Sequence, residues 1–250
     1  MSRIHWDDAP LADMGNKTGI DPAMHLALDE AWLMAAEAGE VGPCLRTWEF
    51  SSPVVVLGRS SKVDLETNRA FCQRRGIEIY RRCSGGASIV GGPGCMMYSV
   101  ILSIADHPRI AKIDGAHDYV MGQVLAATRR QSPRVQLQGI CDLTWQNRKF
   151  SGNALRLTRR HVLYHGTILY AADLELIGGC LDFAPRQPDY RQGRDHQSFI
   201  TNAPVDPACL SRDLANQFDA ACGPTPETVI RRAEELVSKR YSCEDWRYRH

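Results

Sequence analysis

The stretch Lys149-Phe150-Ser151-Gly152-Asn153-Ala154 places a cation beside small residues in a segment with the alternation of a β-strand. The pattern predicts paired strands over Phe150–Leu157 and His161–Tyr170, with Arg159-Arg160 as the turn between them. Small residues on a sheet leave room for a ligand to lie across it, where the ammonium group of Lys149 can reach a charged head group. The alternative is a hairpin lysine that faces solvent. The segment therefore indicates a ligand site built on a pair of strands.

A second unusual stretch lies upstream and reads Arg81-Arg82-Cys83-Ser84-Gly85-Gly86-Ala87-Ser88-Ile89-Val90-Gly91-Gly92-Pro93-Gly94. It connects strands predicted over Ile77–Arg82 and Cys95–Ile104. Glycine lets backbone N–H groups approach an anion closely, and arginine supplies a permanently charged planar group for phosphate or carboxylate. The alternative is a flexible hairpin with incidental arginines. The stretch indicates a site for an anionic ligand.

The rest of the chain mixes helices with strands. Asp21-Pro22 provides an N-cap and a proline at the first helical position, which predicts a helix over Pro22–Ala38. Further strands are expected over Leu45–Phe50, Val54–Leu57 and Arg134–Trp145, further helices over Asp64–Arg75, Asp114–Arg129, Asp173–Leu181 and Pro224–Arg240, and a loop rich in arginine, proline and glutamine over Pro185–His196. This order favours an α+β (mixed α/β) fold with a largely antiparallel sheet flanked by helices.

Composition excludes several classes of protein. The 250 residues are 44% hydrophobic and 24% charged, as expected for one or two ordinary globular domains. The net charge of +1 gives no reason to expect nucleic-acid or membrane-surface binding. The start lacks a secretory signal, and the longest apolar runs, Val54–Leu57 and Tyr98–Ala105, are too short to span a bilayer. Nine cysteines without a C-x-x-C pair favour reduced thiols and a cytoplasmic location over disulfides or a zinc site.

Together the two stretches resemble the lipoate–protein ligase family, within the wider biotin/lipoate ligase and octanoyltransferase superfamily. The glycine-rich stretch is similar to the family pattern R-R-x-S-G-G-G-x-V-x-H-D-x-G. Three further segments match the family's D-L, K-x-S-G-N-A and H-G-T, namely Asp142-Leu143, Lys149–Ala154 and His165-Gly166-Thr167. Gly58-Arg59 with Glu66-Thr67-Asn68 is similar to an earlier G-R…E-x-N stretch.

The resemblance runs from about Pro22 to Asn202, which is most of the chain. It implies a class II synthetase-like catalytic domain with a largely antiparallel sheet. We expect a single lipoate ligase-like catalytic domain over 1–250, without a separate C-terminal accessory domain.

The resemblance also implies an ATP-dependent reaction, in which lipoate or octanoate becomes an acyl-adenylate and is passed to a lysine of an acceptor protein. Lys149 would be the catalytic residue, because its ammonium group would stabilise the charge that develops as the mixed anhydride forms. The residues expected around ATP and its phosphates are Arg82, Ser84, Gly85, Gly86, Ala87, Ser88, Ile89, Val90 and Asp142, with Asp142 also expected to bind Mg²⁺. The residues expected around the acyl chain are Lys149, Gly152, Ala154, His165 and Gly166.

The partners implied by the resemblance are proteins. The expected acceptors are lipoyl domains of 2-oxoacid dehydrogenases or the H-type protein of glycine cleavage. A separately encoded accessory protein is a further expected partner, whereas nucleic acid and membrane are not.

Departures from the family pattern leave other functions open. Ala87 replaces the third glycine, Gly91-Gly92 replaces His-Asp, and Gly92-Pro93-Gly94 is similar to the G-P-G of octanoyltransferases. The first alternative is therefore an ATP-independent octanoyl or lipoyl transferase, with Cys141 or Cys180 as the thiolate nucleophile. The second alternative is a non-catalytic relative that binds a lipoyl group.

Two kinds of candidate residue also have plain structural explanations. The alternative for His165 is a structural histidine bonded to a neighbouring strand. The alternative for each cysteine is an inert buried thiol, which is the common state of free cysteine in protein cores.

Overall fold

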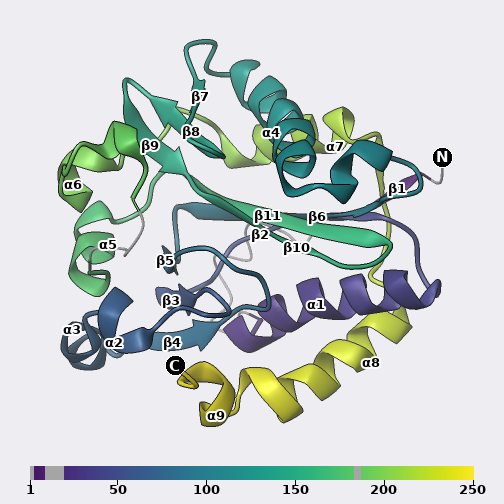
Figure 1. Ribbon diagram of the computed structural model, residues 1–250, viewed down its shortest axis with the longest axis horizontal. Coiled ribbons are helices and arrows are strands. Elements are labelled where there is room, and N and C mark those ends of the chain that lie inside the picture. The colour runs from purple at the N-terminus through teal and green to yellow at the C-terminus, as the bar shows by residue number, and fades with distance from the viewer. Residues whose placement is uncertain (1–2, 9–19, 183–186) are drawn as a thin grey trace.

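In the part of the chain that the computed structural model describes, residues 3–8, 20–182 and 187–250, a six-stranded sheet has the order β10-β11-β6-β2-β1-β12 (Figure 1). Neighbouring strands from β10 to β2 are antiparallel, whereas β1 runs parallel to both β2 and β12. The bounds are β1 Ile4–Asp8, β2 Cys44–Trp48, β6 Cys95–Ser103, β10 Asn153–Leu157, β11 His161–Leu169 and β12 Ala220–Cys222. The antiparallel half of this sheet carries most of the site described below.

Helices cover both faces of the central sheet, with α1 and α8 on one face and α4 and α7 on the other (Figure 1). The bounds are α1 Pro22–Ala38, α4 Ile113–Arg129, α7 Pro207–Gln217 and α8 Glu227–Leu236. The Asp21 side chain caps α1 by accepting from the backbone N–H of Ala23, and Gly39 ends the helix with a φ of 77°. Because α1 lies between the sheet and α8, it is buried around nearly its whole circumference.

Two three-stranded sheets flank the central one and carry the two unusual stretches. In the first, β3 runs parallel to β4 and antiparallel to β5, and the second is the antiparallel meander β7-β8-β9. The bounds are β3 Val54–Leu57, β4 Glu78–Arg81, β5 Ile89–Gly91, β7 Gln136–Gln138, β8 Asp142–Trp145 and β9 Arg148–Ser151. The glycine-rich loop joins β4 to β5, and Lys149 lies on β9, which Gly152 separates from β10.

Short helical segments complete the described chain. Their bounds are α2 Val63–Glu66, α3 Arg69–Arg74, α5 Leu174–Cys180, α6 His196–Phe199 and α9 Glu244–Arg247, with single turns at η1 Pro108–Ala111, η2 Asp189–Arg191 and η3 Val237–Tyr241. None of the described helices is both long enough and apolar enough to cross a membrane.

Arg81, at the end of β4, is fully buried and links two distant segments. Its guanidinium group donates to the carbonyl oxygens of Gly58 and Ser61, at 2.8 Å each, and to that of Trp246 at 3.0 Å. The Trp246 indole returns a hydrogen bond to the Arg81 carbonyl at 2.9 Å. The segment around Trp246 is thus fastened to the strand from which the glycine-rich loop leaves.

The mixed α/β fold expected from the sequence is confirmed. The expectation of one strand over Arg134–Trp145 is wrong, because the chain turns at Gly139, which has a φ of 58°, and forms β7 and β8 instead. The expectation of one helix over Asp64–Arg75 is also wrong. Thr67, which lies between α2 and α3, is extended and pairs with Leu181.

Other boundaries also differ from the expected ones. The strand expected over Phe150–Leu157 is divided at Gly152, and the helix expected over Pro224–Arg240 starts only at Glu227. β1 and α7 are not among the elements that the sequence predicts. The sequence of β1, IHWDD, has the polar content of a loop. Residues 185 and 186 of the expected loop Pro185–His196 lie outside the described residues.

Candidate active site

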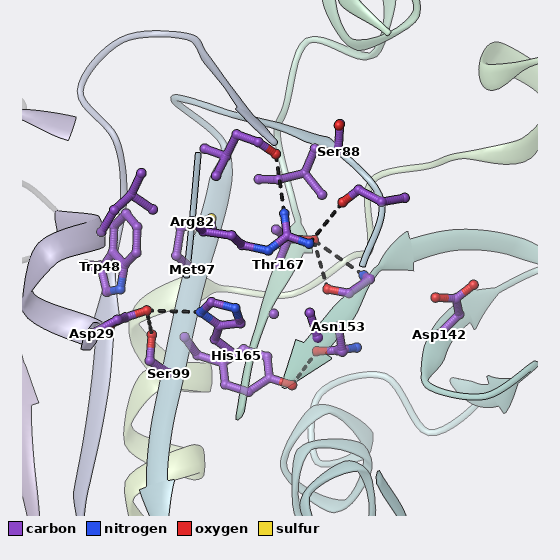
Figure 2. Close-up of a pocket in the computed structure, with 18 of the residues that line it drawn as sticks. Asp29, Trp48, Arg82, Ser88, Met97, Ser99, Asp142, Asn153, His165 and Thr167 are labelled. Atoms are coloured by element: carbon purple, nitrogen blue, oxygen red, sulfur yellow. Dashed lines mark hydrogen bonds and ion pairs between the residues drawn. The ribbon is translucent and has the colours of Figure 1, made fainter. Parts of the chain in front are cut away.

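A cavity of about 660 Å³, its mouth included, lies between the antiparallel strands of the central sheet, α1 and the glycine-rich loop (Figure 2). We call it the first cavity. Apolar residues of α1 and of strands β2, β3 and β6 form much of its wall, namely Leu26, Trp48, Val56, Met97 and Tyr98. The remaining lining residues are Asp29, Arg82, Ala87, Ser88, Ile89, Ser99, Asp142, Lys149, Gly152, Asn153, Ala154, His165, Gly166 and Thr167. An apolar wall with a few convergent polar groups suits a small organic ligand.

Lys149 lies in the wall of this cavity, beside Asp142 of the neighbouring strand. The Lys149 Nζ atom is 2.8 Å from Asp142 Oδ1, and the Tyr190 hydroxyl donates to Asp142 Oδ2 at 2.8 Å. A side chain in place of Gly152 would come within 3.1 Å of the lysine Nζ, so the glycine leaves the ammonium group its space. Strand pairing of β8 with β9 thus brings the two motif residues together.

The guanidinium group of Arg82 is buried inside the glycine-rich loop. It donates to Ser84 Oγ at 3.0 Å and to the carbonyl oxygens of Val56, Gly85 and Ala87 at 3.3, 2.6 and 3.0 Å. Burial lowers the pKa of Arg82 to about 10. These four hydrogen bonds, three to the loop and one to Val56 of β3, make Arg82 a scaffold for the loop rather than a group that extends freely toward a phosphate.

The remainder of the glycine-rich loop is held from outside. The Ser88 backbone N–H and hydroxyl both donate to Glu66 Oε2, at 2.9 and 2.7 Å. Gly86 takes the left-handed conformation with a φ of 86°, whereas Ala87 does not have a positive φ. Alanine is therefore compatible with its position, and its methyl group faces the cavity without backbone strain.

His165 belongs to a chain of buried polar groups. His165 Nδ1 is 3.0 Å from Asp29 Oδ2, and Nε2 is 2.6 Å from Ser84 Oγ. Burial opposes ionisation of Asp29, but the hydrogen bond from His165 and the Arg46 guanidinium together hold the pKa of that carboxyl below its ordinary value. An ionised Asp29 accepts from Nδ1–H, and Nε2 is hydrogen-bonded to the Ser84 hydroxyl. His165 is thus a wall residue with a fixed orientation.

Gly166 and Asn153 pair across β11 and β10. A side chain at Gly166 would overlap the Asn153 amide, so only glycine fits beside it. The Asn153 side chain donates to the Cys141 carbonyl at 2.6 Å and accepts from the Tyr98 hydroxyl at 2.5 Å. These contacts fix the floor of the first cavity.

Cys141 and Cys180, the two candidate nucleophiles, do not line the first cavity. Cys180 is fully buried, and burial raises the pKa of its thiol to about 12. Cys141 lies next to Asp142, but its Sγ contacts the Asn153 carbonyl at 3.4 Å, and burial raises its pKa to about 11. A thiolate is the reactive form of cysteine, so both environments oppose nucleophilic attack.

A second cavity, of about 770 Å³ with its open side, adjoins the first. Residues shared by the two walls are Ala87, Ser88, Ile89, Lys149, Gly152 and Thr167. The other lining residues are Val90, Phe150, Ser151, Leu169, Ile177, Leu181, Pro188, Arg191, His196, Phe199 and Ile200. Lys149 therefore stands in the wall that the two cavities share.

The residues present do not form a metal site of the usual kind. No group of three or more His, Cys, Asp or Glu side chains that could hold an ion occurs within the described ranges. Both oxygens of Asp142, the expected Mg²⁺ ligand, are paired with Lys149 and Tyr190. We therefore assign no chemical step to a metal ion.

The sequence missed several residues that the fold brings to the site. Asp29 and Trp48, which line the first cavity (Figure 2), and Tyr190, which contacts Asp142, lie outside the two stretches. The one signal for Asp29 is that it and Glu30 lie between apolar residues of a helix, where a buried carboxylate needs a partner. Trp48 and Tyr190 carry no local signal of function.

Comparison with known proteins identifies the family to which the chain belongs. Residues 21–205 match the family model of the lipoyl protein ligase A/B catalytic domain. The octanoyltransferase LipM of Brevibacillus brevis is 25% identical over 266 aligned residues, which cover 92% of this chain and 96% of that protein. The solved structure of protein Ta0514 of T. acidophilum with bound lipoic acid has a TM-score of 0.79 at 20% identity, covering 99% of this chain and 98% of the other.

A solved lipoate-protein ligase A bound with ATP has a TM-score of 0.73 at 21% identity and covers 98% of both chains. At these identities the structural likeness shows a shared fold. The family match spans most of the sequence and contains both stretches from which the sequence interpretation began. The chain belongs to the lipoyl protein ligase A/B catalytic domain family.

Proposed function

We propose that the protein is an ATP-dependent lipoate or octanoate–protein ligase. The observation that carries this proposal is the position of Lys149, at the junction of the first cavity, with its wall of Leu26, Trp48 and Met97, and the second cavity. An acyl chain in the first cavity and a nucleotide in the second would bring a carboxylate and an α-phosphate together beside its ammonium group.

The proposed reaction has two steps. A carboxylate oxygen attacks the α-phosphorus of ATP, the P–O bond to pyrophosphate breaks, and an acyl-adenylate forms. An acceptor lysine amine then attacks the acyl carbonyl, its proton is lost, and AMP leaves. In both steps negative charge develops near the mixed anhydride, where a fixed ammonium group lowers the barrier.

Each part of the site has a role in this proposal. The apolar wall with Trp48 and Met97 would hold the hydrocarbon of the acid by burial. Of the backbone N–H groups in the loop from Ser84 to Val90, those that Glu66 and β3 do not engage would face the phosphates, with Arg82 keeping the loop in shape. His165, oriented by Asp29, would bound the acyl site. The likeness to structures that hold lipoic acid and ATP supports both ligands. The acceptor would be a lipoyl domain.

Octanoyl transfer without ATP is the second candidate, favoured by the similarity to LipM along nearly the whole chain. It requires a cysteine that accepts the acyl group as a thioester and then releases it to the acceptor lysine. The candidates Cys141 and Cys180 have raised thiol pKa values and lie outside the wall of the first cavity. Their environment is the reason that we place the ligase first.

Pyrophosphate exchange into ATP, stimulated by lipoate or octanoate, tests the ligase. We expect exchange in the wild type and a loss of about 100-fold or more in Lys149→Ala, the effect of removing one group that stabilises developing charge. Lys239→Ala is the matched control, because Lys239 also pairs with a carboxylate, Glu235, but on the exposed surface. Full exchange in Lys149→Ala would contradict the role of this residue. A mass shift on a cysteine after incubation with octanoyl carrier protein, without ATP, would instead identify the transferase.

A further inference from the structure

The loop rich in arginine, proline and glutamine is fastened to the strands that carry the site. Arg194 donates to the carbonyl of Asn147 at 2.9 Å, in the turn between β8 and β9. Arg148 of β9 donates to the carbonyl of Gln197 at 2.7 Å. The backbone N–H of Thr201 donates to the carbonyl of Lys149 at 2.8 Å. The segment 188–201 therefore follows the β8–β9 hairpin along its length.

Several contacts within the same segment hold Tyr190 in place. Arg194 donates to the Tyr190 carbonyl at 2.7 Å, and Arg191 and Arg194 exchange hydrogen bonds between their Nε atoms and backbone carbonyls at 2.8 and 3.0 Å. The Tyr190 ring packs 5.3 Å from the Phe199 ring, centroid to centroid. A side chain at Gly139 would press on the ring at 3.3 Å, so glycine gives the tyrosine its place. These contacts fix the direction in which the Tyr190 hydroxyl group points.

That direction is toward Asp142. The Tyr190 hydroxyl donates to Oδ2 at 2.8 Å, and Lys149 Nζ lies 2.8 Å from Oδ1. Tyr190 is not among the residues that line either cavity, so its hydroxyl reaches the site through the carboxylate alone. With both oxygens engaged, the carboxylate cannot rotate without breaking a charge-assisted hydrogen bond.

We propose that Tyr190 is a positioning residue, which acts through Asp142 to hold the Lys149 ammonium group at the junction of the two cavities. This inference rests on the proposed function in requiring that Lys149 serve the reaction. Removal of the hydroxyl lets the carboxylate and the lysine move, which slows the chemical step and leaves substrate binding in the cavities intact.

The test compares Tyr190→Phe with Tyr170→Phe. Tyr170 is a matched control because its hydroxyl also donates to a carboxylate, Glu49 Oε2, at 2.8 Å, but outside both cavities. We expect kcat to fall about tenfold in Tyr190→Phe, with KM values for ATP and acid changed less than about twofold, and no such change in Tyr170→Phe. Equal kcat values in the two variants would overturn the proposal.

A double-mutant cycle asks whether the effect passes through Asp142. If it does, adding Tyr190→Phe to Asp142→Asn lowers kcat no further, and independent, multiplying losses would overturn the proposal. The rate of reductive methylation of Lys149, followed by mass spectrometry, is a readout that needs no turnover. It should rise in Tyr190→Phe and not in Tyr170→Phe, and equal rates would again overturn the proposal.

Failure of the proposed function has a separate signature. A wild type that transfers octanoyl groups without ATP refutes the ligase, and the Tyr190 comparison is then made in that transfer reaction. A wild type with neither reaction also refutes the ligase, and the methylation rate of Lys149 then decides about Tyr190 alone.

Discussion

Protonation of His25 is expected to destabilise the protein in mild acid. His25 lies on α1 and is only 4% exposed, with its ring stacked on that of Trp48 at 4.4 Å between centroids and 6° between planes. Its Nδ1 atom has no hydrogen-bond partner among the described residues. Burial and, to a smaller extent, the positive charge of Arg46 lower the pKa of His25 to about 3, against the opposing effect of Asp29.

The sign follows from proton binding in the two states. Below about pH 6.5 the unfolded chain binds a proton at this histidine, whereas the folded protein binds it only near pH 3. The stability associated with neutral His25 is therefore complete above about pH 6.5 and is lost as the pH falls toward 3. A pH of 5.0 lies about 1.5 units below the pKa of this histidine in the unfolded chain, so the free energy of unfolding is lower there by about 2 kcal/mol.

Urea unfolding of the wild type and of His25→Phe, at pH 7.5 and pH 5.0, measures this loss. Phenylalanine keeps the stacked ring and removes the titrating group. We expect the free energy of unfolding to fall by about 2 kcal/mol more in the wild type than in the variant, or roughly 4–8 °C in melting temperature. The other histidines titrate in both proteins and cancel in the difference. Equal losses in the two proteins would refute the reasoning.

Substitutions of Arg82 and of the two candidate cysteines test the loop and the thiols. Arg82→Lys should lower the free energy of unfolding by about 2 kcal/mol or more, because a lysine cannot replace four guanidinium hydrogen bonds. Nucleotide binding, measured by calorimetry, should also weaken. Unchanged stability and affinity would contradict this role of Arg82. Cys141→Ser and Cys180→Ser, singly and together, should retain most ATP-dependent acyl transfer in an acceptor-modification assay, because an acyl-adenylate needs no thiolate; ATP-independent transfer that is lost in either variant would identify a transferase.

The sequence located the site residues that lie in short contiguous patterns. Lys149 and the stretch His165-Gly166 stand out because small residues lie beside them, such as Gly166, where any side chain would overlap the Asn153 amide, whereas Asp142 stands out through the Asp142-Leu143 pattern. Pairing of β8 with β9 places Asp142 beside Lys149, and pairing of β10 with β11 places His165 and Gly166 opposite Ala154 and Asn153.

The rest of the site depends on contacts that have no local pattern. Asp29 meets His165 across 136 positions of sequence, and Tyr190 meets Asp142 across 48. The orientation of Arg82 was also beyond sequence reasoning, since an arginine beside glycines is equally suited to binding an anion or to bonding loop carbonyls. These contacts and this orientation follow from packing between segments that are distant in the sequence, which the composition of a single segment does not reveal.

The link between Arg81 and Trp246 has a consequence for the order of folding. The two residues are 165 positions apart, so a ribosome must synthesise most of the chain before this contact can form. Contacts between distant positions also require closure of a long loop, which slows folding. We therefore expect β4 and the glycine-rich loop to remain open to solvent and chaperones during synthesis, and to reach their final form in one of the last events of folding.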